Sequence, residues 1–198
     1  TLILAIIGIL LTIYFAAKSR RKKEPKYLMR TISLISSNIK KIKYLNILYK
    51  KLEIENLSVT KLAFWNNGKE TIRSSDVAPK NPIQITIKSD FRILSCDIIY
   101  QKNESNGFVL KLSADKKNII ISFDYVDYLE GIVMQIYHTG NSSSDLVIDG
   151  HVMSYGRLSR NNRKLPFWLN LFSQYKKHIL DKRWNGRYRE FNELLNAR

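Results

Sequence analysis

Few residues of this chain have the type and the spacing that catalysis requires. Cys96 is the single cysteine, the three histidines stand alone in the sequence, and no serine lies in a known nucleophile motif. The acidic residues Asp124, Asp127 and Glu130 could offer oxygen ligands to Ca²⁺, but their spacing of three lacks the alternating ligands and the central glycine of a calcium loop. We therefore predict a protein that is not an enzyme and that uses no cofactor and no metal.

The loop between residues 138 and 145 is the first place where a small anionic ligand could bind. Its backbone amides and hydroxyls could donate hydrogen bonds to a phosphate, although it lacks the lysine and the following helix of a P-loop. The alternative is the tip of a hairpin without a ligand. The candidate ligand-binding residues are His138, Thr139, Asn141, Ser142 and Ser143.

The element that must position this loop is a β-domain over residues 27–155. Short runs rich in Ile, Val, Leu and Tyr alternate there with turn residues at intervals of about 8 to 12 residues, which is typical of a sandwich or a barrel. Asn66-Asn67-Gly68 is predicted to form a turn that uses positive φ angles. The expected strands cover residues 27–35, 43–50, 54–66, 83–88, 92–101, 107–113, 118–124, 131–138 and 146–154.

The first seventeen residues carry no charge and predict a transmembrane helix. A basic linker over residues 18–26 follows, and positive residues at the end of a span favour the cytoplasmic side. We therefore expect a single-pass protein of the inner, cytoplasmic membrane with residues 18–198 in the cytoplasm. A cleaved signal peptide is the alternative.

Within this helix, four small residues fall on one face, which would let two helices approach closely. This pattern predicts a homo-oligomer that assembles in the membrane. The residues of this face are Ala5, Gly8, Thr12 and Ala16.

The net charge of +16 is concentrated at the two ends of the chain. Residues 18–51 carry +11, residues 52–156 carry −3, and residues 157–198 carry +8. Basic ends on a membrane-held protein favour contact with anionic lipid headgroups, and nucleic acid is a less favoured partner. In the basic helical segment 156–198, an amphipathic helix over residues 166–184 would dock on the domain or lie in the headgroup plane. The predicted membrane-surface residues are Lys18, Arg20, Arg21, Lys22, Lys23, Trp168, Phe172, Lys176 and Lys177.

The stretch ISFDYVDYLEGIVMQIY, residues 121–137, resembles the corner that leads into a late strand of immunoglobulin-like and fibronectin type III domains. This resemblance implies an immunoglobulin-like antiparallel β-sandwich. The layout of helix and sandwich is similar to that of small bacterial membrane effectors in phage-defence systems, in which oligomerisation perturbs or opens the inner membrane. It implies a membrane effector or assembly protein whose cytoplasmic sandwich senses a ligand or a protein partner. The alternative is a passive tethered scaffold that binds a protein or nucleic acid.

Overall fold

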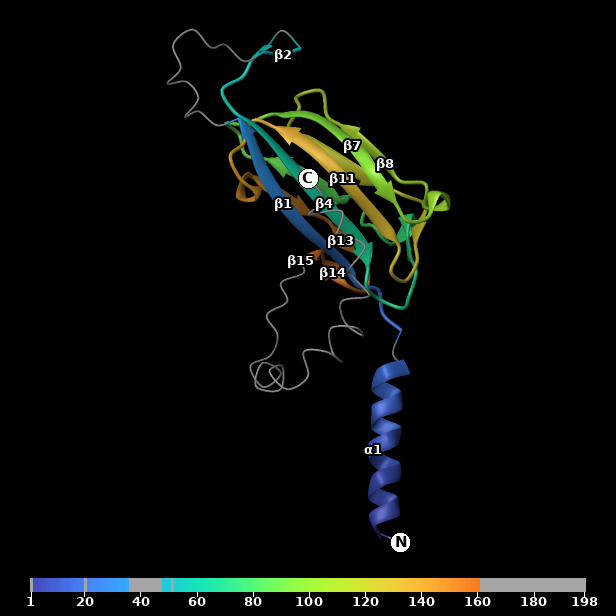
Figure 1. The fold of residues 1–198 in the computed structure, drawn as a ribbon. Helices are drawn as coiled ribbons and strands as arrows, with labels where there is room; N and C mark the ends of the chain where they lie inside the picture. Colours follow the sequence, from blue (N-terminus) through green and yellow to red (C-terminus); the bar gives the residue numbers. More distant parts are fainter. Residues whose placement is uncertain (1, 20, 36–47, 51, 161–198) are drawn as a thin grey trace, which may run out of the picture.

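Two β-sheets packed face to face form the body of the protein, and an N-terminal helix extends from it (Figure 1). The computed structural model describes residues 2–19, 21–35, 48–50 and 52–160. The larger sheet has the order β15-β1-β4-β11-β7 and the smaller sheet has the order β12-β6-β9-β8. The larger sheet consists of β1 (Pro25–Ile35), β4 (Leu57–Asn66), β7 (Ile93–Gln101), β11 (Gly131–His138) and β15 (Ser159–Arg160). The smaller sheet consists of β6 (Gln84–Ile87), β8 (Val109–Leu112), β9 (Asn118–Ser122) and β12 (Leu146–Asp149).

Short elements connect the strands of the two sheets. The two-stranded pairs are β2 (Leu48–Tyr49) with β3 (Leu52–Glu53), β5 (Ile72–Arg73) with β10 (Tyr125–Val126), and β13 (His151–Val152) with β14 (Gly156–Arg157). The 3₁₀ helices among the described residues are η2 (Ser74–Asp76), η3 (Glu104–Asn106) and η4 (Ser143–Asp145).

The core lies between the two sheets because apolar residues alternate along the central strands. On β11, the inward residues Ile132, Met134 and Ile136 are fully buried, as the alternating pattern of GIVMQIYH predicts. The neighbouring strand β4 contributes Leu62 and Phe64, which are paired with β11 through an antiparallel register. Burial of each such side chain contributes about 1.5 to 3 kcal/mol to folding, and these residues share one core cluster with Ile85 and Ile119 of the smaller sheet.

The fold is mainly β, which confirms the predicted class at that level. The strand order identifies no immunoglobulin-like domain, so that finer assignment stays a prediction. The Glu130–Gly131 corner that carries the resemblance is occupied by the start of β11. A side chain at Gly131 would place its Cβ 2.1 Å from the Phe64 carbonyl oxygen, so packing against β4 requires glycine there.

Most predicted strands are confirmed within a few residues, with two differences. The predicted strand 54–66 begins only at Leu57. The predicted strand 146–154 is broken into β12 and β13 at Gly150, where a Cβ would lie 2.8 Å from the Ile83 Cα atom. Of the predicted strand 43–50, the described part contains only β2.

The helix α1 (Leu2–Ser19) points away from the sandwich, and the chain enters β1 shortly after it (Figure 1). Within the described ranges, no helix combines the length and the apolar character needed to cross a membrane. The transmembrane helix over residues 1–17 therefore stays a prediction without support from this finding. The predicted amphipathic helix over residues 166–184, with Trp168, Phe172, Lys176 and Lys177, lies outside the described residues.

Candidate functional site

The first candidate ligand residue, His138, is fully buried inside the sandwich at the end of β11. The Gly140 amide donates to Nδ1 of the ring at 3.1 Å, which assigns the proton to Nε2. Nε2 then donates to Thr60 Oγ1 at 2.7 Å, and Thr60 lies 2.6 Å from the Thr31 hydroxyl. Burial lowers the pKa of His138 to about 4 against a raising influence of Asp145, so the ring is neutral at pH 7.

The loop amides expected to bind an anion already bind the carboxylate of Asp145. The backbone N–H groups of Asn141 and Ser142 donate to its Oδ2 at 2.9 and 3.0 Å, and Lys88 donates to Oδ1 at 3.0 Å. Burial alone would raise the pKa of Asp145, but the bonds from Lys88, Ser142 and Asn141 lower it below its ordinary value. An external anion at these amides would have to displace this ionised side chain.

The remaining loop residues have local structural partners. The Ser142 hydroxyl accepts from the Ser144 amide and caps η4, which begins at Ser143. Thr139 Oγ1 accepts from the Arg92 amide at 2.9 Å. The loop therefore joins β11 to β12 as a capped turn, and its use as a ligand site stays a prediction.

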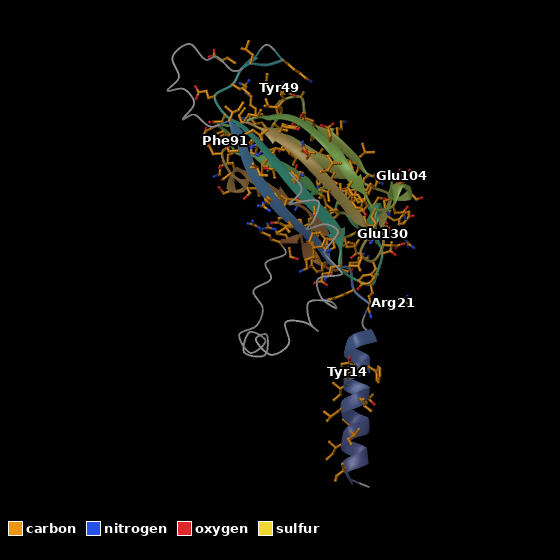
Figure 2. All side chains as sticks on the ribbon, viewed as in Figure 1. Tyr14, Arg21, Tyr49, Phe91, Glu104 and Glu130 are labelled. Carbon is orange, nitrogen blue, oxygen red and sulfur yellow. The ribbon has the colours of Figure 1, made fainter. Side chains whose placement is uncertain are left out.

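Thr139 also lines a pocket of about 390 Å³ at the end of the sandwich opposite α1. Figure 2 places Phe91, another lining residue, at that end and Arg21 at the end next to the helix. The charged lining residues are the carboxylates of Glu53, Glu55 and Asp90 together with Arg92. This excess of negative charge does not suit an anionic ligand.

A second, more basic site lies where the chain passes from α1 into the sandwich. A pocket of about 270 Å³ is lined by four cations, two carboxylates and two hydroxyls. The cations come from two segments that are distant in the sequence, the linker after α1 and the region around β5. The lining residues are Arg21, Lys23, Lys69, Glu70, Thr71, Arg73, Ser75 and Asp76.

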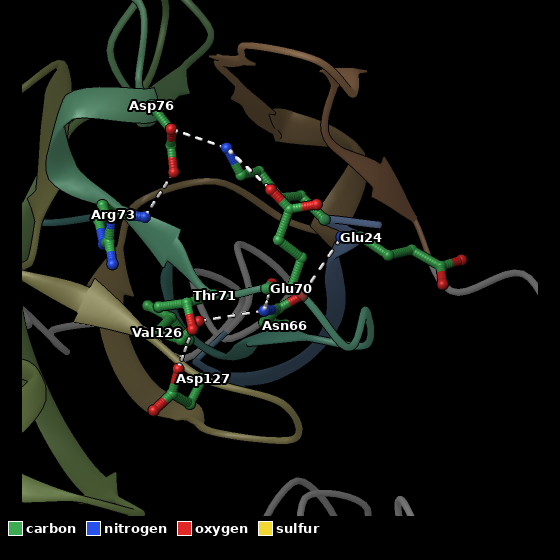
Figure 3. Close-up of polar contacts among 9 residues, drawn as sticks. Glu24, Asn66, Glu70, Thr71, Arg73, Asp76, Val126 and Asp127 are labelled. Carbon is green, nitrogen blue, oxygen red and sulfur yellow. Dashed lines mark hydrogen bonds and ion pairs between the residues drawn. The ribbon is translucent and has the colours of Figure 1, made fainter. Parts of the chain in front are cut away.

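Two lining residues of this junction pocket, Lys23 and Asp76, form an ion pair (Figure 3). Lys23 Nζ lies 2.8 Å from Asp76 Oδ1 and 3.6 Å from Glu70 Oε1, and the Arg73 amide donates to Asp76 Oδ2 at 2.7 Å. The hydrogen bond with Asp76 raises the pKa of Lys23 despite desolvation. Desolvation would raise the pKa of Asp76, but Lys23 and the Arg73 amide lower it, so both groups are ionised at neutral pH.

The linker is fixed to the sandwich by the buried side chain of Asn66 at the end of β4 (Figure 3). Asn66 Oδ1 accepts from the Glu24 amide at 3.2 Å and from the Gly68 amide at 2.9 Å. Its Nδ2 donates to the carbonyl groups of Glu70 and Val126. One side chain thus ties together the linker, the 66–70 turn and β10.

The predicted turn at Asn66-Asn67-Gly68 exists, but the reason given for its glycine is wrong. Gly68 has no positive φ angle. A Cβ on Gly68 would lie 2.0 Å from the Lys22 carbonyl oxygen, so glycine is required by the close approach of the linker.

The predicted membrane-surface residues Lys22 and Lys23 differ in how accessible their side chains are to an external partner. The Lys22 side chain is 66% exposed and lies 3.6 Å from Glu24. The Lys23 side chain is only 12% exposed because it faces Asp76, so its charge is already compensated within the protein. Lys69 and Arg73, which line the same pocket, are not predicted by the sequence, because they lie about fifty residues along the chain from Arg21 and carry no local signal of this position.

Glu130, the last of the three acidic residues weighed as oxygen ligands for Ca²⁺, accepts several hydrogen bonds at the corner before β11. The Glu130 carboxylate accepts from the Asn103 and Asn106 side-chain amides at 2.9 and 2.7 Å, and from the Asp127 amide at 3.3 Å. Burial would raise the pKa of Glu130, but these bonds lower it. The carboxylate therefore connects η3 to the start of β11.

Comparison of the chain with protein-family models, with curated proteins and with solved structures found no match. The class that the coordinates define is a two-sheet β-protein with an apolar N-terminal helix. A β-fold of this kind hosts many functions, so the function must be argued from the helix and the two pockets.

Proposed function

We propose that this chain is a membrane-anchored, non-enzymatic assembly protein. In this proposal α1 inserts into a lipid bilayer and pairs with α1 of other copies, while the sandwich presents a recognition surface close to the membrane. The single observation that carries the proposal is the exposure of the apolar side chains of α1.

Large apolar residues of α1 are between 47% and 74% exposed, and they occur on most of the helix circumference. Surface helices of soluble domains bury such residues against a core, whereas the sandwich covers none of these side chains. Transfer of one such side chain out of water contributes about 1.5 to 3 kcal/mol, so water is a poor environment for this helix. The exposed residues are Ile3, Ile6, Ile7, Ile9, Leu10, Leu11, Ile13, Tyr14 and Phe15.

The backbone and the polar atoms of α1 suit a lipid environment. The hydroxyl of Thr12 donates to the Gly8 carbonyl at 2.8 Å, so it needs no outside partner. The 18 residues of α1 cover about 27 Å, slightly less than a hydrocarbon core of about 30 Å. Local thinning of the bilayer accommodates a mismatch of this size at modest cost.

The small residues of α1 support assembly within the bilayer. Ala5, Gly8 and Thr12 follow each other at helical spacing, which places these three small residues on one face of α1. Apart from its chain neighbours and the backbone of α1 itself, no atom lies within 4 Å of a Cβ built on Gly8, so a second helix has room to approach there. Close approach of this kind drives association of membrane helices.

The anchoring role is tested by membrane fractionation of cells that express the full chain. We expect the wild-type chain to stay in the membrane fraction after alkaline carbonate treatment, and Ile6→Lys with Leu10→Lys to release it. Each lysine at the centre of an inserted helix costs about 3 kcal/mol. The matched control is Val109→Lys with Val147→Lys, which changes two apolar residues of similar exposure on the sandwich and leaves α1 intact.

Two results would contradict the anchor. One is release of the wild-type chain by carbonate. The other is retention of the variant with two lysines in α1 in the membrane fraction.

Assembly is tested by cross-linking in membranes with Gly8→Ile and Thr12→Ile. We expect these changes to abolish the cross-linked species, whereas Ile3→Leu with Leu10→Ile, outside the small-residue face, should preserve it.

An effector that opens the membrane would also release dye from vesicles, and Gly8→Ile with Thr12→Ile would suppress the release. Anchoring without assembly and without dye release would favour the passive scaffold.

A further inference from the structure

The junction pocket between the linker and β5 has a charge pattern that suits one kind of ligand. Arg21, Lys69 and Arg73 are exposed, whereas Lys23 is held inside by Asp76. Both carboxylates of the pocket face Lys23, since Glu70 lies 3.6 Å and Asp76 2.8 Å from its Nζ. Four cations against two carboxylates leave the pocket with an excess of positive charge.

The pocket is held in shape before any ligand arrives. The Lys22 carbonyl accepts from the Glu70 amide at 3.3 Å, and the Glu24 carbonyl accepts from the Asn67 amide at 2.9 Å. The linker thus lies against the 66–70 turn, which fixes Arg21 beside the segment that carries Lys69 and Arg73. A binding site with a fixed arrangement loses less entropy when a ligand binds.

The position of the pocket favours a lipid over an anion from solution. Arg21 follows the last residue of α1, Ser19, by only two positions, and Figure 2 shows it between the helix and the sandwich. An apolar helix that enters the bilayer brings this end of the sandwich to the level of the headgroups. Arginine is well suited to phosphate because its planar guanidinium can donate two parallel hydrogen bonds.

We infer that the junction pocket binds the phosphate-bearing headgroup of an anionic phospholipid, with Arg21, Lys69 and Arg73 as the ligand-binding cations. This inference rests on the proposed membrane anchor and goes beyond it, because it assigns a lipid class to a defined site. Lys23 and Asp76 hold the pocket in place and do not contact the lipid.

The test measures the thermal unfolding midpoint of the full chain in a neutral detergent. The probes are dihexanoyl-phosphatidylglycerol, dihexanoyl-phosphatidylcholine and inorganic phosphate. We expect only the phosphatidylglycerol to raise the midpoint in a saturable way, because a ligand that binds the folded state stabilises it. In Arg21→Gln/Lys69→Gln/Arg73→Gln the apparent Kd should weaken tenfold or more.

The matched control is Arg30→Gln/Arg92→Gln/Lys111→Gln, which removes the same charges from exposed positions outside the pocket. It should bind phosphatidylglycerol like the wild-type chain. Equal loss of binding in both triple variants would overturn the inference, since only overall charge would then matter. An equal response to phosphatidylcholine, or to inorganic phosphate, would also overturn it.

Failure of the inference is separable from failure of the anchor. Flotation with vesicles of phosphatidylcholine alone reports insertion of α1 without any anionic headgroup. A chain that floats with these vesicles but does not respond to phosphatidylglycerol has the anchor and lacks the headgroup site. A chain that does not float with them lacks the anchor itself.

Discussion

The buried ring of His138 makes the stability of the sandwich depend on pH. Its pKa is lowered from 6.5 to about 4 in the folded protein, so the unfolded chain takes up a proton first as the pH falls. The stabilising contribution of the neutral ring is therefore complete above pH 6.5 and is lost as the pH falls toward 4. From these two pKa values, stability should decrease by about 2 kcal/mol between about pH 7.5 and pH 5.

This pH window isolates the histidine from the carboxylates. Asp76, Asp145 and Glu130 have lowered pKa values in the folded protein. Their contributions are complete above the ordinary pKa values of 3.8 and 4.5 and are lost only below them. A decrease in the free energy of unfolding as the pH falls from 7.5 to 5 is therefore expected from His138 and not from these carboxylates.

The assay is urea unfolding of the full chain in a neutral detergent, followed by tryptophan fluorescence at several pH values. His138→Gln keeps an amide that can donate to Thr60 but cannot be protonated, so its stability should be nearly constant between pH 7.5 and pH 5. His151→Gln changes an exposed histidine of β13 and should keep the wild-type slope. A wild-type chain equally stable at both pH values, or a His138→Gln variant that retains the slope, would refute the reasoning.

Three further predictions concern the junction between α1 and the sandwich, and each is measured by the same unfolding assay at neutral pH. Asn66→Ala should destabilise the fold by about 3 to 5 kcal/mol because it leaves four backbone groups without their partner, and a cost under 1 kcal/mol would contradict this role. Gly68→Ala should cost about 3 kcal/mol because of the clash with the linker, whereas Gly8→Ala, with open space around it, should leave unfolding unchanged; equal effects would contradict the packing argument. Asp76→Asn should cost about 2 kcal/mol by leaving the largely buried Lys23 without its main partner, and the double variant with Lys23→Met should recover part of the loss; no recovery would count against the pair.

The sequence predicts the strands well because their signal is local. The alternation of Ile132, Met134 and Ile136 is visible in eight consecutive residues, and β11 has the predicted bounds. The sequence pattern does not predict the break at Gly150, because the break depends on the close approach of Ile83, which lies far away in the chain.

The candidate sites depend on contacts between distant segments, so the sequence predicts them poorly. The pairing of Pro25 with Asn66 brings the linker beside the 66–70 turn, and nothing in either segment alone indicates this register. For the same reason the sequence does not indicate that Lys69 and Arg73 line the junction pocket, or that Lys23, a predicted membrane-surface residue, pairs with Asp76. The ligand loop is a different case, because the partner of its amides is local: Asp145 accepts from the amides of Asn141 and Ser142, four and three residues before it.

The docking of the linker against the 66–70 turn limits how far the sandwich can travel. Ser19 ends α1 and Arg21 already lines the junction pocket, so two positions of the chain separate the helix from the docked linker. Two residues reach at most about 7 Å, so the sandwich cannot move far from the end of the helix. If α1 is inserted in a membrane, the sandwich would stay within a thin layer next to the lipid headgroups. Its binding partners would then have to reach that layer.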